Sequence, residues 1–159
     1  MAITFDTSID QQRENYVGAT LTYAYTVGAG ANPSLYVGVM YDDGGVGATL
    51  TGATYNGVAM TLLLDVVHSR AGYRIAEFGL LAPAQSAAHN VVITGSATTD
   101  IISCAASYLG VQQIDAHASA TAASGTALTA TLATVKNNTW TIGFVDADQG
   151  WSAVVTGTL

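Results

Sequence analysis

Charged residues are scarce in this 159-residue sequence, because Asp, Glu, Lys and Arg together make up only 9% of it. Basic residues are the rarest: four Lys and Arg stand against eleven Asp and Glu, which gives a formal net charge of -7. Nucleic acids and anionic membranes are bound by clusters of Lys and Arg. The four basic residues are scattered (Arg13, Arg70, Arg74 and Lys136), so the sequence argues against both kinds of partner.

Cysteine and long hydrophobic runs are also lacking. The single cysteine, Cys104, cannot form a disulfide within the chain, and its apolar neighbours predict a small buried residue rather than a nucleophile. No apolar run has the length of a transmembrane helix, and the first residues do not resemble a secretion signal. Half of the residues are nevertheless hydrophobic, which is enough for a core. The sequence therefore predicts one domain, residues 1–159.

Alternation of apolar and polar residues with a period of two dominates the chain and predicts strands. Residues 16–27 show it best, with Leu21, Tyr23 and Tyr25 on one face and threonines on the other. Asn56-Gly57 lies between two strand-like runs and predicts a hairpin, because both residues tolerate positive φ. Further strands are predicted at 34–41, 53–55, 58–63, 73–82, 88–94, 100–111, 126–134, 139–145 and 152–156. The small-residue segment 115–125 fits either a loop or a weak strand.

These nine or ten short strands, with no amphipathic helix between them, predict the fold class. Strands spaced in this way form antiparallel sheets rather than a parallel sheet with crossover helices. The expected fold is all-β, a single antiparallel β-sandwich of the jelly-roll type.

Catalytic motifs are absent from the sequence, which contains no GxSxG, HExxH, P-loop or dinucleotide-binding pattern. We therefore expect neither an enzyme nor a cofactor. Some alternatives stay open. Asp42 with Asp43, and Asp146 with Asp148, are the only tight acidic pairs and could bind calcium through loop oxygens. Glu77 is an isolated carboxylate in an apolar strand. The three histidines, which could form a zinc site only if they met in space, are His68, His89 and His117.

Aromatic side chains offer one further alternative, a platform on which a sugar ring could stack. Trp151 follows a glycine near a loop and is the best surface candidate, whereas Trp140 alternates with threonines and is expected to face a core. The other candidates for such a platform are Tyr36, Tyr41, Tyr55 and Tyr73.

Several segments, taken in order, resemble a known module. They are the opening Ile-Thr-Phe-Asp, residues 35–39, the hairpin 53–61, and residues 79–83, 89–94, 106–111 and 140–144. This order is similar to a β-sandwich module of tailed-phage virion proteins and of some bacterial surface proteins. More loosely, it resembles the jelly-roll cement or decoration proteins of phage capsids. The similarity covers nearly the whole chain and contains no catalytic residue. Such modules often continue with more strands, so a sheet edge here is either open or completed by a neighbour.

The resemblance implies a structural virion protein. We expect a capsid cement or decoration subunit, assembled in the host cytoplasm, that bridges capsomers on the capsid surface as a homotrimer. Its partners are then the major capsid protein and further copies of itself. The alternative is a tail-associated receptor- or carbohydrate-binding module. Apolar residues near the chain ends are the expected subunit contacts, namely Ile3, Phe5, Trp151, Val154 and Val155.

The trimer implied by the resemblance can be tested in solution. Light scattering on the purified protein should give about three times 16.2 kDa. Because so few charges are available, the contact should be apolar or made by the main chain, and the mass should not change with salt. A monomer at micromolar concentration, at any salt concentration, would count against an apolar subunit contact in solution.

Overall fold

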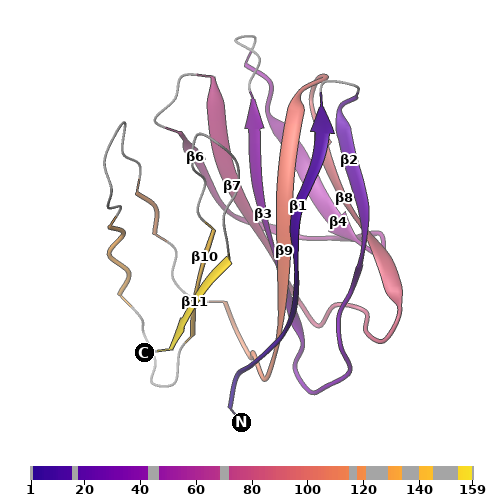
Figure 1. Cartoon of the computed structure of the whole chain (residues 1–159), viewed down its shortest axis with the longest axis vertical. Helices are drawn as coiled ribbons and strands as arrows, with labels where there is room; N and C mark the ends of the chain where they lie inside the picture. The colour runs from indigo at the N-terminus through magenta and orange to yellow at the C-terminus, as the bar shows by residue number, and fades with distance from the viewer. Residues whose placement is uncertain are drawn as a thin grey trace.

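The structure is a computed structural model of the whole chain (Figure 1). It describes residues 2–15, 18–42, 47–68, 72–114, 118–120, 129–133, 140–144 and 154–158, and for residues 10, 11, 13–15 and 154–158 it describes the backbone. Within these ranges there is no helix of the length and hydrophobicity that crossing a lipid bilayer requires.

The described residues form strands only, arranged in two antiparallel sheets and a small hairpin. Sheet A has five strands in the order β1-β9-β3-β7-β6, and sheet B has four in the order β2-β8-β4-β5. A separate two-stranded sheet pairs β10 with β11. The strands are β1 (Thr4–Asn15), β2 (Thr20–Thr26), β3 (Ser34–Asp42), β4 (Leu50–Tyr55), β5 (Val58–Ala59), β6 (Thr61–Val67), β7 (Tyr73–Leu81), β8 (Ala88–Gly95), β9 (Asp100–Leu109), β10 (Trp140–Phe144) and β11 (Val154–Thr158).

The order of the strands in the two sheets is that of a jelly roll, as the sequence predicts. β1, β9, β3 and β7 lie side by side in one sheet, and β2, β8, β4 and β5 lie side by side in the other. The chain therefore passes repeatedly from sheet to sheet. Only Met60 separates β5 from β6, so the chain crosses from sheet B to sheet A at this residue. The side chain of Met60 is buried in the core. If β5 and β6 are counted as one strand, the total agrees with the prediction.

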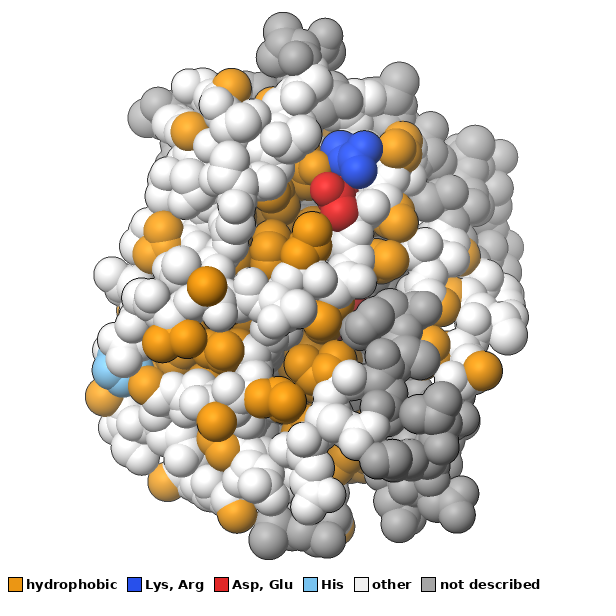
Figure 2. Space-filling model, turned by 180° about the vertical axis from the view of Figure 1, so that it is seen from behind, with side chains coloured by type: hydrophobic (Ala, Val, Ile, Leu, Met, Phe, Trp, Pro, Cys, Tyr) orange, Lys and Arg blue, Asp and Glu red, His pale blue; other side chains and the backbone are white. Residues whose placement is uncertain are grey.

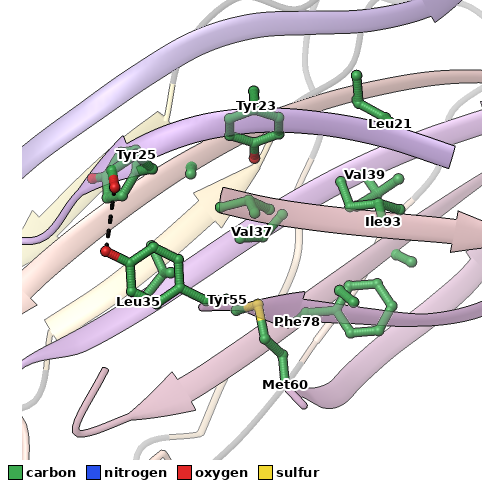
Figure 3. Packing of buried hydrophobic residues seen from close by; sticks show 14 of the residues in the cluster. Leu21, Tyr23, Tyr25, Leu35, Val37, Val39, Tyr55, Met60, Phe78 and Ile93 are labelled. Atoms are coloured by element: carbon green, nitrogen blue, oxygen red, sulfur yellow. Dashed lines mark hydrogen bonds between the residues drawn. The ribbon is translucent and has the colours of Figure 1, made fainter. Parts of the chain in front are cut away.

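The core between the sheets follows from the alternation in β2. Every second residue of β2 is buried, and Leu21, Tyr23 and Tyr25 point inward while the threonines between them are exposed. Odd-numbered residues of β3, such as Leu35 and Val37, meet them from sheet A (Figure 3). The sequence predicted this face of β2 correctly, together with the Asn56-Gly57 hairpin. Asn56 (φ 50°) and Gly57 (φ 75°) both have the positive φ that such a two-residue turn needs.

Buried tyrosine hydroxyls bind the two sheets to each other. Tyr23 shares a 2.9 Å hydrogen bond with Ser103 of β9, and Tyr25 shares one of 3.0 Å with Ser107. Tyr55 donates to the main-chain oxygen of Tyr25 at 3.2 Å (Figure 3). A buried hydroxyl without a partner would cost about 1–3 kcal/mol, so these bonds favour one alignment of the sheets.

The outer face of sheet A is covered as well. Outward side chains of β3 and β9, namely Tyr36, Ala106 and Tyr108, belong to a second buried cluster. The side chains of Trp140, Ile142 and Phe144 pack against this cluster from β10. The hairpin β10–β11 thus adds a third layer over part of the sandwich. The sequence suggested two layers, because residues 139–145 and 152–156 looked like ordinary sandwich strands.

Two sequence-based predictions of local structure differ from the structure, and one strand was not predicted. The predicted strand at 126–134 is not a strand at 129–133, where the described residues are mostly exposed and irregular. The predicted strand at 58–63 is divided at Met60. β1 was not predicted, because its polar sequence does not alternate and its register with β9 shifts twice. An edge strand with such shifts needs no regular apolar pattern.

The difference between buried and exposed leucines provides a test of the core. Leu35 is fully buried between the sheets, whereas Leu62 is 51% exposed. We expect Leu35→Ala to lower the free energy of unfolding by about 2–5 kcal/mol. Leu62→Ala, the matched control, should lower it by about 1 kcal/mol or less. Urea denaturation measures both, and equal losses would contradict this assignment of the core.

Candidate functional site

The charged residues are distributed unevenly between the two sheets. None of the four strands of sheet B contains Asp, Glu, Lys or Arg. The chain itself has no charged residue from Tyr16 to Tyr41. Charged positions occur instead in β1, β3, β6, β7 and β9, all of them in sheet A. The shortage of charge is therefore concentrated on one side of the sandwich.

The outward side chains of sheet B form a neutral surface, called here the sheet B face. Its residues are Thr20, Thr22, Ala24, Thr26, Gly52, Thr54, Ala88, Asn90, Val92 and Thr94. They present hydroxyl, methyl and amide groups, and those of β2 are all exposed. Figure 2 shows the molecule from behind, where blue and red side chains are few and lie mainly near the top, while hydrophobic side chains are numerous. Burying such a surface removes no charge from water, which keeps its desolvation cost low.

Three charged side chains of sheet A, those of Asp6, Asp65 and Arg74, make contacts inside the molecule. Arg74 of β7 donates from Nε to Asp65 of β6 at 3.0 Å, and the hydroxyl of Tyr41 donates to the same carboxylate. Asp6 of β1 accepts from the amide of Gly28 and from the hydroxyl of Ser107, both at 2.7 Å. These contacts are structural: they hold β6 on β7, and the start of β1 on the loop after β2.

Two of the five predicted contact residues lie on the outer face of sheet A. Phe5 is 48% exposed, and its ring meets that of Tyr108 edge to face, with the ring centres 5.7 Å apart. Trp140 of β10 contacts the same tyrosine at 5.8 Å. Ile3 is half-buried against this cluster. The first residues of the chain and the hairpin β10–β11 therefore meet around Tyr108, which the sequence could not show.

The other predicted contact residues are described less fully. Val154 and Val155 lie in β11, where their backbones pair with Phe144 and Gly143 of β10. Trp151 lies outside the described residues. β11 is the second strand of the hairpin that covers sheet A, so Val154 and Val155 lie on the same side of the molecule as Ile3 and Phe5.

The aromatic platform does not form from the tyrosines proposed for it. Tyr36, Tyr41 and Tyr55 are buried, the first on the outer face of sheet A and the others between the sheets. Tyr73 is half-buried and contacts the ring of His68. Aromatic residues fit a pleated core as well as a surface, which is why these tyrosines were candidates although they lie inside. Trp151, the best surface candidate, lies outside the described residues. Trp140 packs on the second core cluster, as expected.

The possible metal ligands are not brought together in the part of the chain that the structure describes. No group of three His, Cys, Asp or Glu side chains there could hold an ion. Asp42 is half-buried at the end of β3, and Thr99 donates to its main-chain oxygen. His68 follows β6 in sheet A, whereas His89 belongs to β8 in sheet B. Asp43, His117, Asp146 and Asp148 lie outside the described residues.

Glu77 is the carboxylate that the sequence alone could not interpret. It lies on the outer face of sheet A, next to Gly38 of β3, which has Cys104 of β9 on its other side. Phe144 covers Gly38 so closely that a methyl group there would lie 2.5 Å from the ring. Burial beside this hairpin raises the pKa of Glu77 to about 7. Cys104 is buried too, as the sequence predicted.

No family model, curated protein or solved structure matches the chain.

The raised pKa of Glu77 predicts a pH-dependent stability. The unfolded chain releases this proton near pH 4.5, whereas the folded protein keeps it until about pH 7. Protonation therefore stabilises the fold below pH 4.5, and this contribution is lost as the pH rises to 7. Between pH 4.5 and 7.5 the wild type should lose about 3 kcal/mol relative to Glu77→Gln. Urea denaturation at both pH values measures this difference, and parallel behaviour of the two proteins would contradict the burial of the carboxylate.

Proposed function

We propose that the protein is a structural subunit of a tailed-phage virion, a capsid cement or decoration protein that acts as a homotrimer and bridges capsomers. The observation that carries this proposal is the sheet B face, an entire side of the sandwich without a charged residue. The sequence resemblance suggests a phage virion, and the neutral sheet B face supports a role in assembly.

Neutral surfaces suit permanent contact between proteins. The centres of protein interfaces are depleted in charged residues, because each buried charge must be stripped of water. A soluble domain usually carries charges of both signs over its whole surface. In this chain the net charge is -7, yet none of the strands of sheet B contains a charged residue.

The proposed mechanism is mechanical. A jelly roll whose sheets are joined by buried hydroxyl bonds, such as Tyr23 to Ser103, is a rigid block. Bound across the boundary between capsomers, it adds contact area that must be broken before the capsomers separate. The major capsid protein is the proposed partner of the sheet B face.

The trimer contact is proposed at the cluster around Tyr108. Phe5 is the one exposed large aromatic side chain among the described residues, and exposed aromatics are common anchors of subunit contacts. Ile3 adjoins it, and Val154 and Val155 belong to the covering hairpin. With Trp151 they remain the proposed contact residues.

The location of the protein in particles tests this proposal. Quantitative mass spectrometry of purified virions should find the chain at hundreds of copies per particle, as a lattice of capsomers requires. A handful of copies would indicate the alternative, a tail-associated receptor- or carbohydrate-binding module. Absence from particles would contradict both virion functions.

A further inference from the structure

The edges of the two sheets differ in how well they are protected. A strand at a sheet edge presents unpaired N–H and C=O groups that can bind another strand. Proteins usually block such pairing with charges, bulges or very short edge strands. The two sheets here have four edges, formed by β1 and β6 in sheet A and by β2 and β5 in sheet B.

Three of these edges carry such protection. β1 has two shifts of register against β9 and contains Asp6, Asp10, Arg13 and Glu14. β6 has a shift of register between Leu62 and Leu64, followed by Asp65. β5 consists of two residues before the chain leaves the sheet at Met60. None of the three offers a long and regular ladder to a second chain.

The edge formed by β2 has none of these features. Its seven residues pair with β8 in an unbroken register, from Thr20 opposite Thr94 to Thr26 opposite Ala88. It contains no charged residue, no proline and no bulge. β1 lies beside it, and the hydroxyl of Tyr25 donates to the main-chain oxygen of Thr7 from the buried side of β2. Within the part of the chain that the structure describes, the outer edge of β2 is thus unpaired, regular and neutral.

The backbone groups that face this free edge can be identified. The amide of Gly95 donates to the oxygen of Ala19 at 2.7 Å, so the ladder to β8 uses the odd-numbered residues of β2. In an antiparallel strand the intervening residues direct both backbone groups the other way. The outward groups therefore belong to Thr20, Thr22, Ala24 and Thr26, whose side chains are all exposed.

We propose that β2 binds β2 of a second copy of this chain, antiparallel about a twofold axis, so that sheet B continues from one molecule into the other. With the axis at Tyr23, Thr22 pairs with Ala24 of the second copy and Thr20 pairs with its Thr26. Every outward backbone group of β2 then has a partner. An isologous contact of this kind uses one patch twice.

The second copy is favoured over another occupant by charge and by register. Two molecules that each carry a net charge of -7 repel one another, and sheet B is the side on which their approach meets no charged residue. A register centred on Tyr23 places each outward residue of β2 opposite an outward residue of the second copy. The paired sheets also join two sheet B faces into one larger neutral surface, which would double the area available to a partner.

This twofold contact goes beyond the proposed threefold one and does not depend on it. The threefold contact is proposed on the outer face of sheet A, and the twofold contact uses the edge of sheet B. Alone, the β2 contact gives dimers; together with the threefold contact it gives hexamers or larger assemblies. An edge contact is small beside the roughly 800 Å² per partner of a stable complex, so it should form at high protein concentration and reverse on dilution.

Substitution of Ala24 tests the proposal in purified protein. Ala24→Pro removes an outward N–H that the monomer does not use, and proline is tolerated at sheet edges. Ala24→Ser, the matched control, keeps the N–H at the same site. Sedimentation velocity over a wide range of concentrations should show wild type and Ala24→Ser doubling in mass. For Ala24→Pro the association constant should fall by roughly tenfold or more. Wild-type protein that stays a monomer or a trimer at all concentrations would overturn the proposal, as would equal association of the two variants.

Amide hydrogen exchange on the wild type keeps the test decisive if Ala24→Pro fails to fold. The amides of Thr22 and Ala24 should exchange quickly in dilute protein and slowly in concentrated protein. Those of Leu21 and Tyr23, which face β8, should be protected at both concentrations. Exchange of Thr22 and Ala24 that is independent of concentration would overturn the twofold contact. Neither result depends on whether the chain is found in virions.

Discussion

Sheet A is apolar on both of its faces, and the positions of the other elements follow from the need to cover each one. β9 is buried along almost its whole length, which an antiparallel strand with one solvated face would not be. Sheet B covers one face, through Tyr23 and Tyr25. The hairpin β10–β11 covers part of the other, through Trp140 and Phe144. Among the described residues no second element covers sheet B, whose outer side chains on β2 are exposed.

The low charge of the chain is most evident in sheet B, because none of its strands contains a charged residue. Charged groups are found in sheet A, where Arg74 is paired with Asp65 and Asp6 is bonded to Ser107. A surface of Thr, Ala and Asn side chains is wettable and costs little to desolvate. Such a surface suits a subunit that must remain soluble before assembly and then associate closely. This is the physical basis of the proposed role in a virion.

The fold could be predicted from the sequence wherever local pattern and burial agreed. β2 alternates because one face of it is buried, and the Asn56-Gly57 turn needs positive φ at both residues. β1 could not be predicted, because pairing at a sheet edge depends on distant contacts. The third layer formed by β10 and β11 could not be predicted for the same reason. The candidate site could be predicted only in part, because it also depends on contacts between distant segments. Ile3 and Phe5 were chosen as apolar residues near a chain end, but their meeting with Trp140 at Tyr108 depends on the third layer.

The most direct test of the central claim is a high-resolution structure of the chain in its assembled state. The account predicts that a neighbouring protein covers the sheet B face, with Thr22, Asn90 and Val92 buried and no charged residue of this chain at the centre of the contact. A structure in which these side chains remain in solvent, while the charged residues of sheet A make the contacts, would contradict it.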